Sequence, residues 1–217
     1  MRSLIGKMSW FLLVILCFNN CYSQTEWALK KDKDGIKVYT GKAADSKFNM
    51  IRVSCKLNGS LSSLASILLQ PEIQPEWVIA TKTTKLVKRL ANNHIYYYTI
   101  ASIPWPLSNR DLIIDLWIQQ DSLTKKMIIH ANTIDKIIPP IAGLERVLFS
   151  QATWEVIPIA VNQIQVEYIL KINPGGGIPA WVVNMFITKG PFESFYNLSK
   201  IIQEKRFQGQ QFDFIKN

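Results

Sequence analysis

Few side chains in this sequence have the types and spacing that catalysis or metal binding requires. The two histidines, His94 and His130, each lie in a strand-like pattern, and neither has a second histidine or a cysteine pair at ligand spacing. A metal site needs such a cluster. Cys55 lies in an apolar strand pattern, so we expect a buried, inert thiol. We therefore predict no metal and no cofactor.

Signatures of covalent and acid–base catalysis are also missing. The sequence has no Gly-x-Ser-x-Gly nucleophile motif, and the glycines at 175–177 lack the Gly-Lys-Ser/Thr ending of a phosphate-binding loop. The acids Asp115, Glu155 and Glu167 occur singly on alternating stretches. An acid–base pair inside a cavity stays open at this point, but no motif indicates one. We predict no catalytic residue and no enzyme activity.

Arg110 and Asp111 form the sharpest local feature, two adjacent charges at the start of a long strand pattern. In one interpretation Arg110 meets the polar head of a ligand. In the other, the pair ties the preceding loop to a neighbouring segment. We favour the structural interpretation, because paired buried charges more often organise a fold than bind a ligand.

Strands dominate the elements that must position these residues. Alternating or apolar stretches predict strands at 35–40, 49–57, 82–90, 94–101, 110–120, 127–133, 147–157 and 163–172. Helical spacing predicts a short helix at 61–69, capped by Ser60. A long C-terminal helix should begin near Pro179, be interrupted at Gly190-Pro191 and continue to Ile202. This order indicates an α+β fold with the helices on one face of an antiparallel sheet.

A single helix cannot fill the concave side of a curved sheet, so we expect an internal apolar cavity. Along 110–120 the apolar side chains share one face, and Asp111, Asp115 and Gln119 share the other, which we expect to face water. The hydroxyl of Tyr97 could meet a ligand or bond within the core. The predicted ligand-binding residues are Tyr97, Thr99, Arg110, Leu112, Ile114, Leu116, Val182, Met185, Phe186 and Phe195.

A series of short motifs follows one order along the chain. They are Trp27 with 35–39 (GIKVY), Trp77, 104–111 (PWPLSNRD), 139–146 (PPIAGLER), 173–176 (NPGG) and 178–184 (IPAWVVN). Together they resemble the START domain, the steroidogenic acute regulatory protein-related lipid-transfer family, over about residues 27–202. The resemblance, to a single-domain exported member of bacterial type, implies a helix-grip (START and Bet v 1-like) fold. It also implies a lipid, sterol or similar hydrophobic ligand.

The surface offers two signals for a membrane. Trp105 lies between two prolines, and we expect it to pack beneath the sheet rather than enter a membrane interface. Lysine and arginine cluster at 30–33 and 82–89, either as solvated faces or as a docking surface for anionic lipid headgroups. An isoelectric point near 9.5 would also suit nucleic acid, but no nucleic-acid motif occurs.

The N-terminus has the features of a cleavable signal peptide. Arg2 and Lys7 precede an apolar run at 8–18, and the small residues Cys21 and Ser23 suit a signal peptidase site. The run is too short to span a bilayer. We expect a signal peptide at 1–23, a START-like lipid-binding domain at 24–205 and a flexible tail at 206–217. With 48% apolar and 19% charged residues, the chain as a whole has the composition of a globular protein.

The sequence therefore predicts an exported, periplasmic or secreted monomer that binds a lipid or other hydrophobic molecule for transfer, solubilisation or sensing outside the inner membrane. Transient contact with an anionic membrane is the second partner that we expect, and nucleic acid is not one. Two alternatives stay open. One is an enzyme of the helix-grip superfamily, cyclase- or hydrolase-like, that acts on a hydrophobic substrate. The other is an interaction protein whose cavity is packed shut.

Overall fold

The computed structural model describes residues 25–42, 49–135, 137–175, 177–178 and 185–217. The expected signal peptide at 1–23 and the expected start of the C-terminal helix near Pro179 lie outside these residues. None of the helices in the described part of the chain has the length and apolarity needed to span a bilayer.

Within the described residues, ten strands form one sheet. Its order is β1-β2-β3-β10-β9-β7-β6-β5-β4 with antiparallel neighbours, and β8 pairs in parallel with the beginning of β6. The strands are β1 (Trp27–Lys33), β2 (Ile36–Lys42), β3 (Asn49–Leu57), β4 (Thr81–Ala91), β5 (His94–Ala101), β6 (Asn109–Gln120), β7 (Met127–Thr133), β8 (Leu144–Arg146), β9 (Phe149–Ala160) and β10 (Gln163–Asn173).

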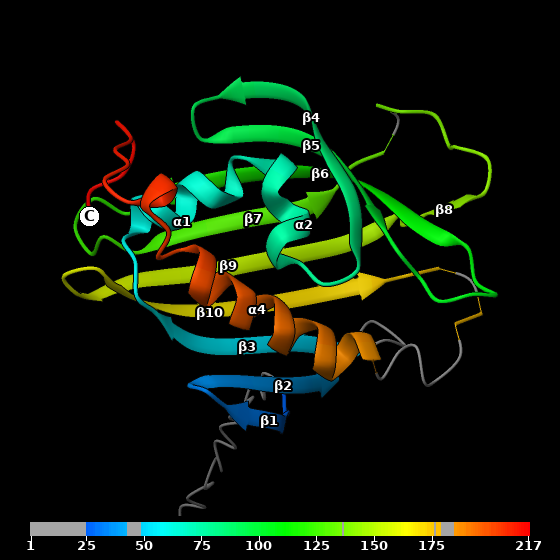
Figure 1. Cartoon of the computed structure of the whole chain (residues 1–217), viewed down its shortest axis with the longest axis horizontal. Coiled ribbons are helices and arrows are strands. Elements are labelled where there is room, and N and C mark those ends of the chain that lie inside the picture. Colours follow the sequence, from blue (N-terminus) through cyan, green and yellow to red (C-terminus); the bar gives the residue numbers. More distant parts are fainter. Residues whose placement is uncertain (1–24, 43–48, 136, 176, 179–184) are drawn as a thin grey trace, which may run out of the picture.

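The helices lie on one face of this sheet. They are α1 (Leu61–Leu68), the 3₁₀ turn η1 (Pro71–Ile73), α2 (Gln74–Trp77), the π-helical η2 (Met185–Lys189), α4 (Gly190–Ile201) and the 3₁₀ turn η3 (Lys205–Phe207). Figure 1 shows α1, α2 and α4 on the same side of the twisted strands. The arrangement confirms the predicted α+β helix-grip fold.

Local chemistry explains where the helices begin. The Ser60 hydroxyl accepts a hydrogen bond from the Ser63 backbone N–H at 3.0 Å, which satisfies one of the free donors at the start of α1. Pro191 lacks a backbone N–H, and α4 begins at the preceding Gly190, directly after the π-helical turn. The predicted interruption of the C-terminal helix at these two residues is therefore present.

The sequence pattern missed β1. This strand is an edge of the sheet, and only Trp27 and Lys31 in it are even partly buried. An exposed edge strand needs no apolar alternation, because its stability comes from backbone pairing with β2. Charged residues on such an edge also prevent pairing with other chains.

The start of β6 differs from the prediction that its polar side chains face water. Asp115 is partly exposed and Gln119 is exposed, but Asp111 is only 1% exposed. The reason is β8, which pairs with this end of β6 and brings the Arg146 guanidinium onto the Asp111 carboxylate. A three-residue strand of that kind has too little pattern to be found in the sequence.

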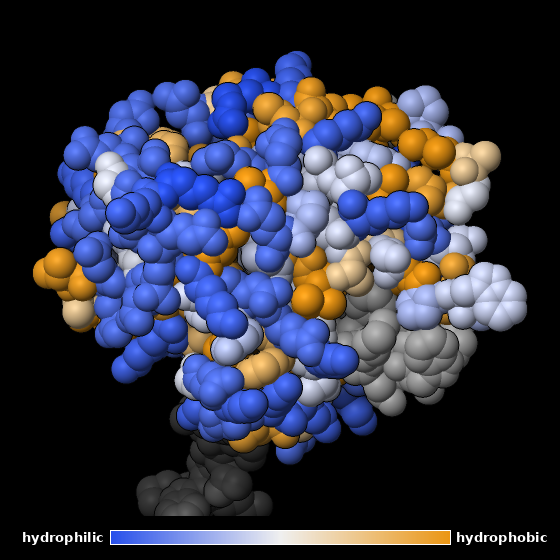
Figure 2. Space-filling view, in the orientation of Figure 1, coloured by the Kyte–Doolittle hydropathy of each residue, from blue (hydrophilic) through white to orange (hydrophobic). Residues whose placement is uncertain are grey.

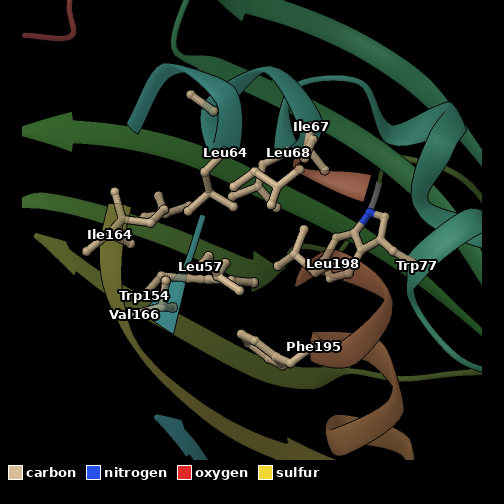
Figure 3. Close-up of a cluster of buried hydrophobic side chains, with 14 of the residues drawn as sticks. Leu57, Leu64, Ile67, Leu68, Trp77, Trp154, Ile164, Val166, Phe195 and Leu198 are labelled. Carbon is tan, nitrogen blue, oxygen red and sulfur yellow. The ribbon is translucent and has the colours of Figure 1, made fainter. Parts of the chain in front are cut away.

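The solid part of the interior lies beneath α1. Figure 3 shows side chains from α1, the sheet and α4 meeting there. Its labelled members, all buried, are Leu57, Leu64, Ile67, Leu68, Trp77, Trp154, Ile164, Val166, Phe195 and Leu198. Several of these residues also form the boundary of the hollow part of the interior described below.

Residues 206–217, which we expected to be a flexible tail, are packed on the domain. Phe207 is 1% exposed and Ile215 is 7% exposed. The Asn217 side chain accepts a hydrogen bond from the Ser62 backbone N–H and donates one to the Ser62 hydroxyl, at the first turn of α1. Apolar side chains too sparse to show a helical period therefore anchor this segment.

Replacing Phe207 by alanine tests this anchoring. We expect Phe207→Ala to lower the free energy of unfolding by about 3–5 kcal/mol, because it empties a fully buried aromatic site. Urea denaturation measures the loss, with Val161→Ala, at a 95% exposed position, as the matched control. A loss below about 1 kcal/mol, the size of an ordinary mutational effect, would show that the tail contributes little to the core.

Candidate ligand cavity

A cavity of about 410 Å³ lies between the inner face of the sheet and the helices. Side chains of β5, β6, β9 and β10 line one side, and α1, α2 and α4 line the other. Its size falls in the range of about 300–1,000 Å³ that is typical of small-molecule sites. At one end the lining comes from connecting segments, with Ile103, Val147, Pro174 and Ile178.

The structure brings seven of the ten predicted ligand-binding residues to this cavity. Strand alternation, which turns every second side chain inwards, places those on β5 and β6. The seven are Tyr97, Thr99, Arg110, Leu112, Ile114, Leu116 and Phe195. Val182 lies outside the described residues, and so do the side chains of Met185 and Phe186. That the seven contact a ligand stays a prediction.

Sequence reasoning missed the part of the lining that comes from β10, and of the helical part it found Phe195 on α4. Tyr168 and Leu170 continue the inward alternation of β10, a signal that could have been used. Gln74 on α2 and Ser194 on α4 carry no such signal. They reach the cavity because the helices cross the sheet there, which is a tertiary feature.

Aromatic rings form a continuous wall of the cavity. The Trp154 ring lies 4.8 Å from Tyr168 and 5.1 Å from Phe195 between ring centroids, and it meets Trp77 edge-on at 6.3 Å. Tilted and edge-on pairs at these distances stabilise each other beyond the area they bury. The wall therefore joins α2 and α4 to the sheet.

A chain of polar side chains enters this apolar lining from β4. The Thr84 hydroxyl donates to Gln74 Oε1 at 3.0 Å, and Gln74 Nε2 donates to the Tyr97 hydroxyl at 3.3 Å. The Thr99 hydroxyl lies 3.1 Å from that of Thr84. Burial raises the pKa of Tyr97 to about 12, despite the opposing hydrogen bond from Gln74. Tyr97 is therefore neutral at physiological pH.

Arg110 is 3% exposed at the end of the cavity lined by connecting segments. Its guanidinium donates to the Ser108 and Pro174 carbonyls and lies 3.3 Å from the Glu145 carboxylate. These partners come from the segment before β6, the segment after β10 and β8. The contacts support the structural interpretation of Arg110, in which the side chain ties loops together.

Asp111 completes a second ion pair next to the first. Its carboxylate accepts hydrogen bonds from Arg146 at 3.0 and 2.8 Å and from the Tyr98 hydroxyl at 3.0 Å. Burial and the hydrogen bond to Asp111 raise the pKa of Tyr98 to about 12. The hydrogen bond to Asp111 likewise raises the pKa of Arg146, the largest of several causes. The charges of Asp111 and Arg146 are thus paired with each other within the fold.

The histidines do not line the cavity. His94 Nε2 lies 2.6 Å from an Asp115 carboxylate oxygen, and the His130 ring stacks on Trp117 at 4.7 Å between centroids. Across the described ranges, no three His, Cys, Asp or Glu side chains are close enough to hold a metal ion.

The sequence that forms this fold matches a known family. The family model of the START domain matches residues 15–206. The chain belongs to the START domain family. The resemblance seen in the short sequence motifs is therefore confirmed over the whole length that they span.

Relatives of this START domain occur in bacteria and in animals. It is 25% identical to an uncharacterized protein of Pseudomonas aeruginosa over 180 residues, 83% of this chain and 88% of that protein. Mouse START domain-containing protein 10 is 23% identical over 170 residues; the match spans 76% of this chain but only 57% of the mouse protein.

A solved structure shares the fold of this START domain. The STAR-related lipid transfer protein fragment of Xanthomonas axonopodis superposes with a TM-score of 0.75 at 24% identity. The match covers 82% of this chain and 99% of that fragment. At this level of identity, the superposition supports the fold.

The buried ion pairs of this START domain give a stability prediction. We expect Asp111→Asn to lower the free energy of unfolding by about 3–5 kcal/mol, because it leaves the buried Arg146 charge without its counter-ion. Chemical denaturation checks the value. Asp32→Asn, which removes an exposed pair with Lys37, should change it by less than about 1 kcal/mol. Equal effects of the two substitutions would contradict a structural role for Asp111.

Proposed function

We propose that this START domain binds a lipid or other hydrophobic molecule in its cavity, for transfer, solubilisation or sensing, without catalysing a reaction. The observation that carries the proposal is the cavity of about 410 Å³, whose lining is mostly apolar. Burial of apolar surface gives about 0.8 kcal/mol per methylene, so a ten-carbon segment gains on the order of 8 kcal/mol before ordering costs. The lipid transfer protein of similar fold supports the same class of ligand.

Binding fits the cavity better than the alternative of an enzyme with a hydrophobic substrate. General acid–base chemistry needs a titratable group within hydrogen-bond reach of the substrate. Both histidines lie away from the cavity, and Arg110, the charged member of the described lining, is held by Glu145 and two carbonyls. Burial raises the pKa of the Tyr97 and Tyr168 phenols in the lining, which makes them poor proton donors near neutral pH. The third alternative was an interaction protein whose interior is filled by its own side chains. The open volume of about 410 Å³ disfavours it.

We further propose that the protein acts outside the inner membrane, in the periplasm or as a secreted monomer. The charged and apolar pattern of residues 1–23 supports export. A carrier in that space exchanges its ligand with membranes, so it needs a surface that meets a bilayer.

The loops at the Arg110 end of the cavity suit such a surface. Trp105 is 90% exposed and Leu148 is 71% exposed, so the expected packing of Trp105 beneath the sheet is wrong. The cis Trp105-Pro106 bond lies in a loop whose neighbour Ile103 lines the cavity. Figure 2 shows apolar residues at the edge where, in Figure 1, the segment before β8 lies. The net charge, +9 for the whole chain and +7 without Arg2 and Lys7 of the expected signal peptide, favours an anionic bilayer.

The two basic clusters at 30–33 and 82–89 lie at the edges of the sheet. Residues 30–33 lie on β1 and residues 82–89 on β4, which are the two edge strands of the sheet. Lysine on an edge strand discourages pairing with other chains. We therefore assign the membrane contact to the apolar loops, with the overall charge assisting the approach.

Ligand binding is tested by filling the cavity. We expect native mass spectrometry of the purified protein to show a bound lipid-sized mass that organic extraction removes. Ala152→Phe, which places a ring into the cavity lining, should abolish the bound mass. Ala160→Phe, at an exposed position of the same strand β9, should retain it. A wild-type protein that never carries or takes up a hydrophobic molecule would refute the proposal.

Membrane contact is tested at Trp105. We expect Trp105→Ala to weaken binding to vesicles of phosphatidylglycerol and phosphatidylcholine about tenfold, the effect of losing part of one buried aromatic side chain. Vesicle sedimentation measures it. Leu123→Ala, at a 91% exposed position in the turn after β6, is the control and should bind normally. If both variants bind equally well, the contact lies elsewhere.

A further inference from the structure

The polar groups inside the cavity indicate what kind of ligand fits it. Most of the lining is apolar, and burying a polar ligand atom against it costs free energy unless the atom forms a hydrogen bond. The donors and acceptors that remain available in the cavity therefore select the polar part of the ligand.

The Tyr97 hydroxyl has one proton left to donate. Gln74 Oε1 accepts the Thr84 proton, so Gln74 turns its NH₂ group towards Tyr97, whose oxygen acts as the acceptor. No group among the described residues accepts the Tyr97 proton in return. Tyr97 is 6% exposed and lines the cavity, so a bound molecule is the partner that this buried donor lacks.

Tyr168 offers a second hydroxyl on the same inner face of the sheet, from a strand well separated from β5 in the strand order. It lies on β10, and its ring is fixed between Trp154 and Phe195 at 4.8 and 5.3 Å between centroids. Its hydroxyl has no hydrogen-bond partner within the described part of the chain. Burial raises the pKa of the Tyr168 phenol, so this hydroxyl is neutral, and Tyr168 lines the same cavity as Tyr97.

Charge at the cavity is already neutralised. Arg110 is the one charged residue in the described lining, and Glu145 lies 3.3 Å from its guanidinium. A carboxylate or phosphate inside the cavity would have to break this pair or stay uncompensated, and an unpaired buried charge is strongly destabilising.

We propose that the ligand is an uncharged lipid whose buried polar group is a hydrogen-bond-accepting oxygen, a carbonyl or a hydroxyl, held by the Tyr97 and Tyr168 hydroxyls. This inference rests on the proposed function and adds the ligand's class and its anchoring point. The apolar remainder of the ligand lies against the aromatic wall, and its oxygen replaces water as the partner of the two phenols.

Three small probes of similar shape test the anchor by isothermal titration calorimetry: benzophenone, diphenylmethane and diphenylacetate. They carry a carbonyl, no polar group and a carboxylate. We expect the double variant Tyr97→Phe with Tyr168→Phe to bind benzophenone about fivefold or more weakly than the wild type, since a net hydrogen bond contributes about 1 kcal/mol. Its affinity for diphenylmethane should be unchanged, and diphenylacetate should bind the wild type weakest of the three.

Tyr96→Phe is the matched control. It removes a hydroxyl from the neighbouring residue of β5, whose side chain lies on the other face of the sheet and does not line the cavity. This variant should bind all three probes as the wild type does. Thermal unfolding verifies that each variant is folded.

The outcomes separate this inference from the proposed function. If benzophenone and diphenylmethane bind the wild type and the double variant with the same ratio of affinities, the tyrosine anchor is refuted and hydrophobic binding stands. Tightest binding of diphenylacetate overturns the uncharged class. If none of the probes binds, the proposed function fails together with the inference.

Discussion

The structure depends on a mismatch between the inner face of the sheet and the helices that cover it. Beneath α1, side chains from the sheet and the helices fill the interior. Towards Arg110 the helices and the inner face of the sheet do not fill the space between them, and about 410 Å³ stays open. At about 24 cal/mol per Å³, a dry and empty space of that volume would cost on the order of 10 kcal/mol, comparable with the whole stability of a domain. A hydrophobic ligand of the kind that we propose would therefore also stabilise the domain.

A hollow domain needs a frame that does not depend on core packing at its open end. Here two ion pairs supply it, one buried between Asp111 and Arg146 and one between the buried Arg110 and the partly exposed Glu145. Arg110 joins the segments on either side of the cavity end through two carbonyls and Glu145, and Asp111 holds Arg146 and Tyr98 on the outer side. Hydrogen bonds to charged groups hold geometry where dispersion contacts are few. The loops can therefore expose apolar side chains to the outside while their backbones stay positioned.

How much of this the sequence predicted follows from the range of each interaction. Alternation along β5 and β6 depends on local backbone geometry, so residues such as Leu112 and Tyr97 could be assigned to the cavity. The exposure of Trp105 and the burial of Phe207 could not be predicted, because both depend on segments distant in the sequence. Asp111 illustrates the same limit. Its polar character predicted exposure, and only the pairing of β8 with β6 explains its burial.

The division between apolar walls and a few polar groups also explains how relatives keep the fold at low identity. Apolar contacts are non-directional, so volume-conserving exchanges leave a cavity wall intact. The Xanthomonas fragment accordingly superposes well at 24% identity. Hydrogen-bonding groups such as Gln74 and Tyr97 are directional, and exchanging one of them leaves its partner unsatisfied. Differences in ligand preference within such a fold should therefore arise from a small number of polar positions, while the surrounding apolar residues drift with little consequence for binding.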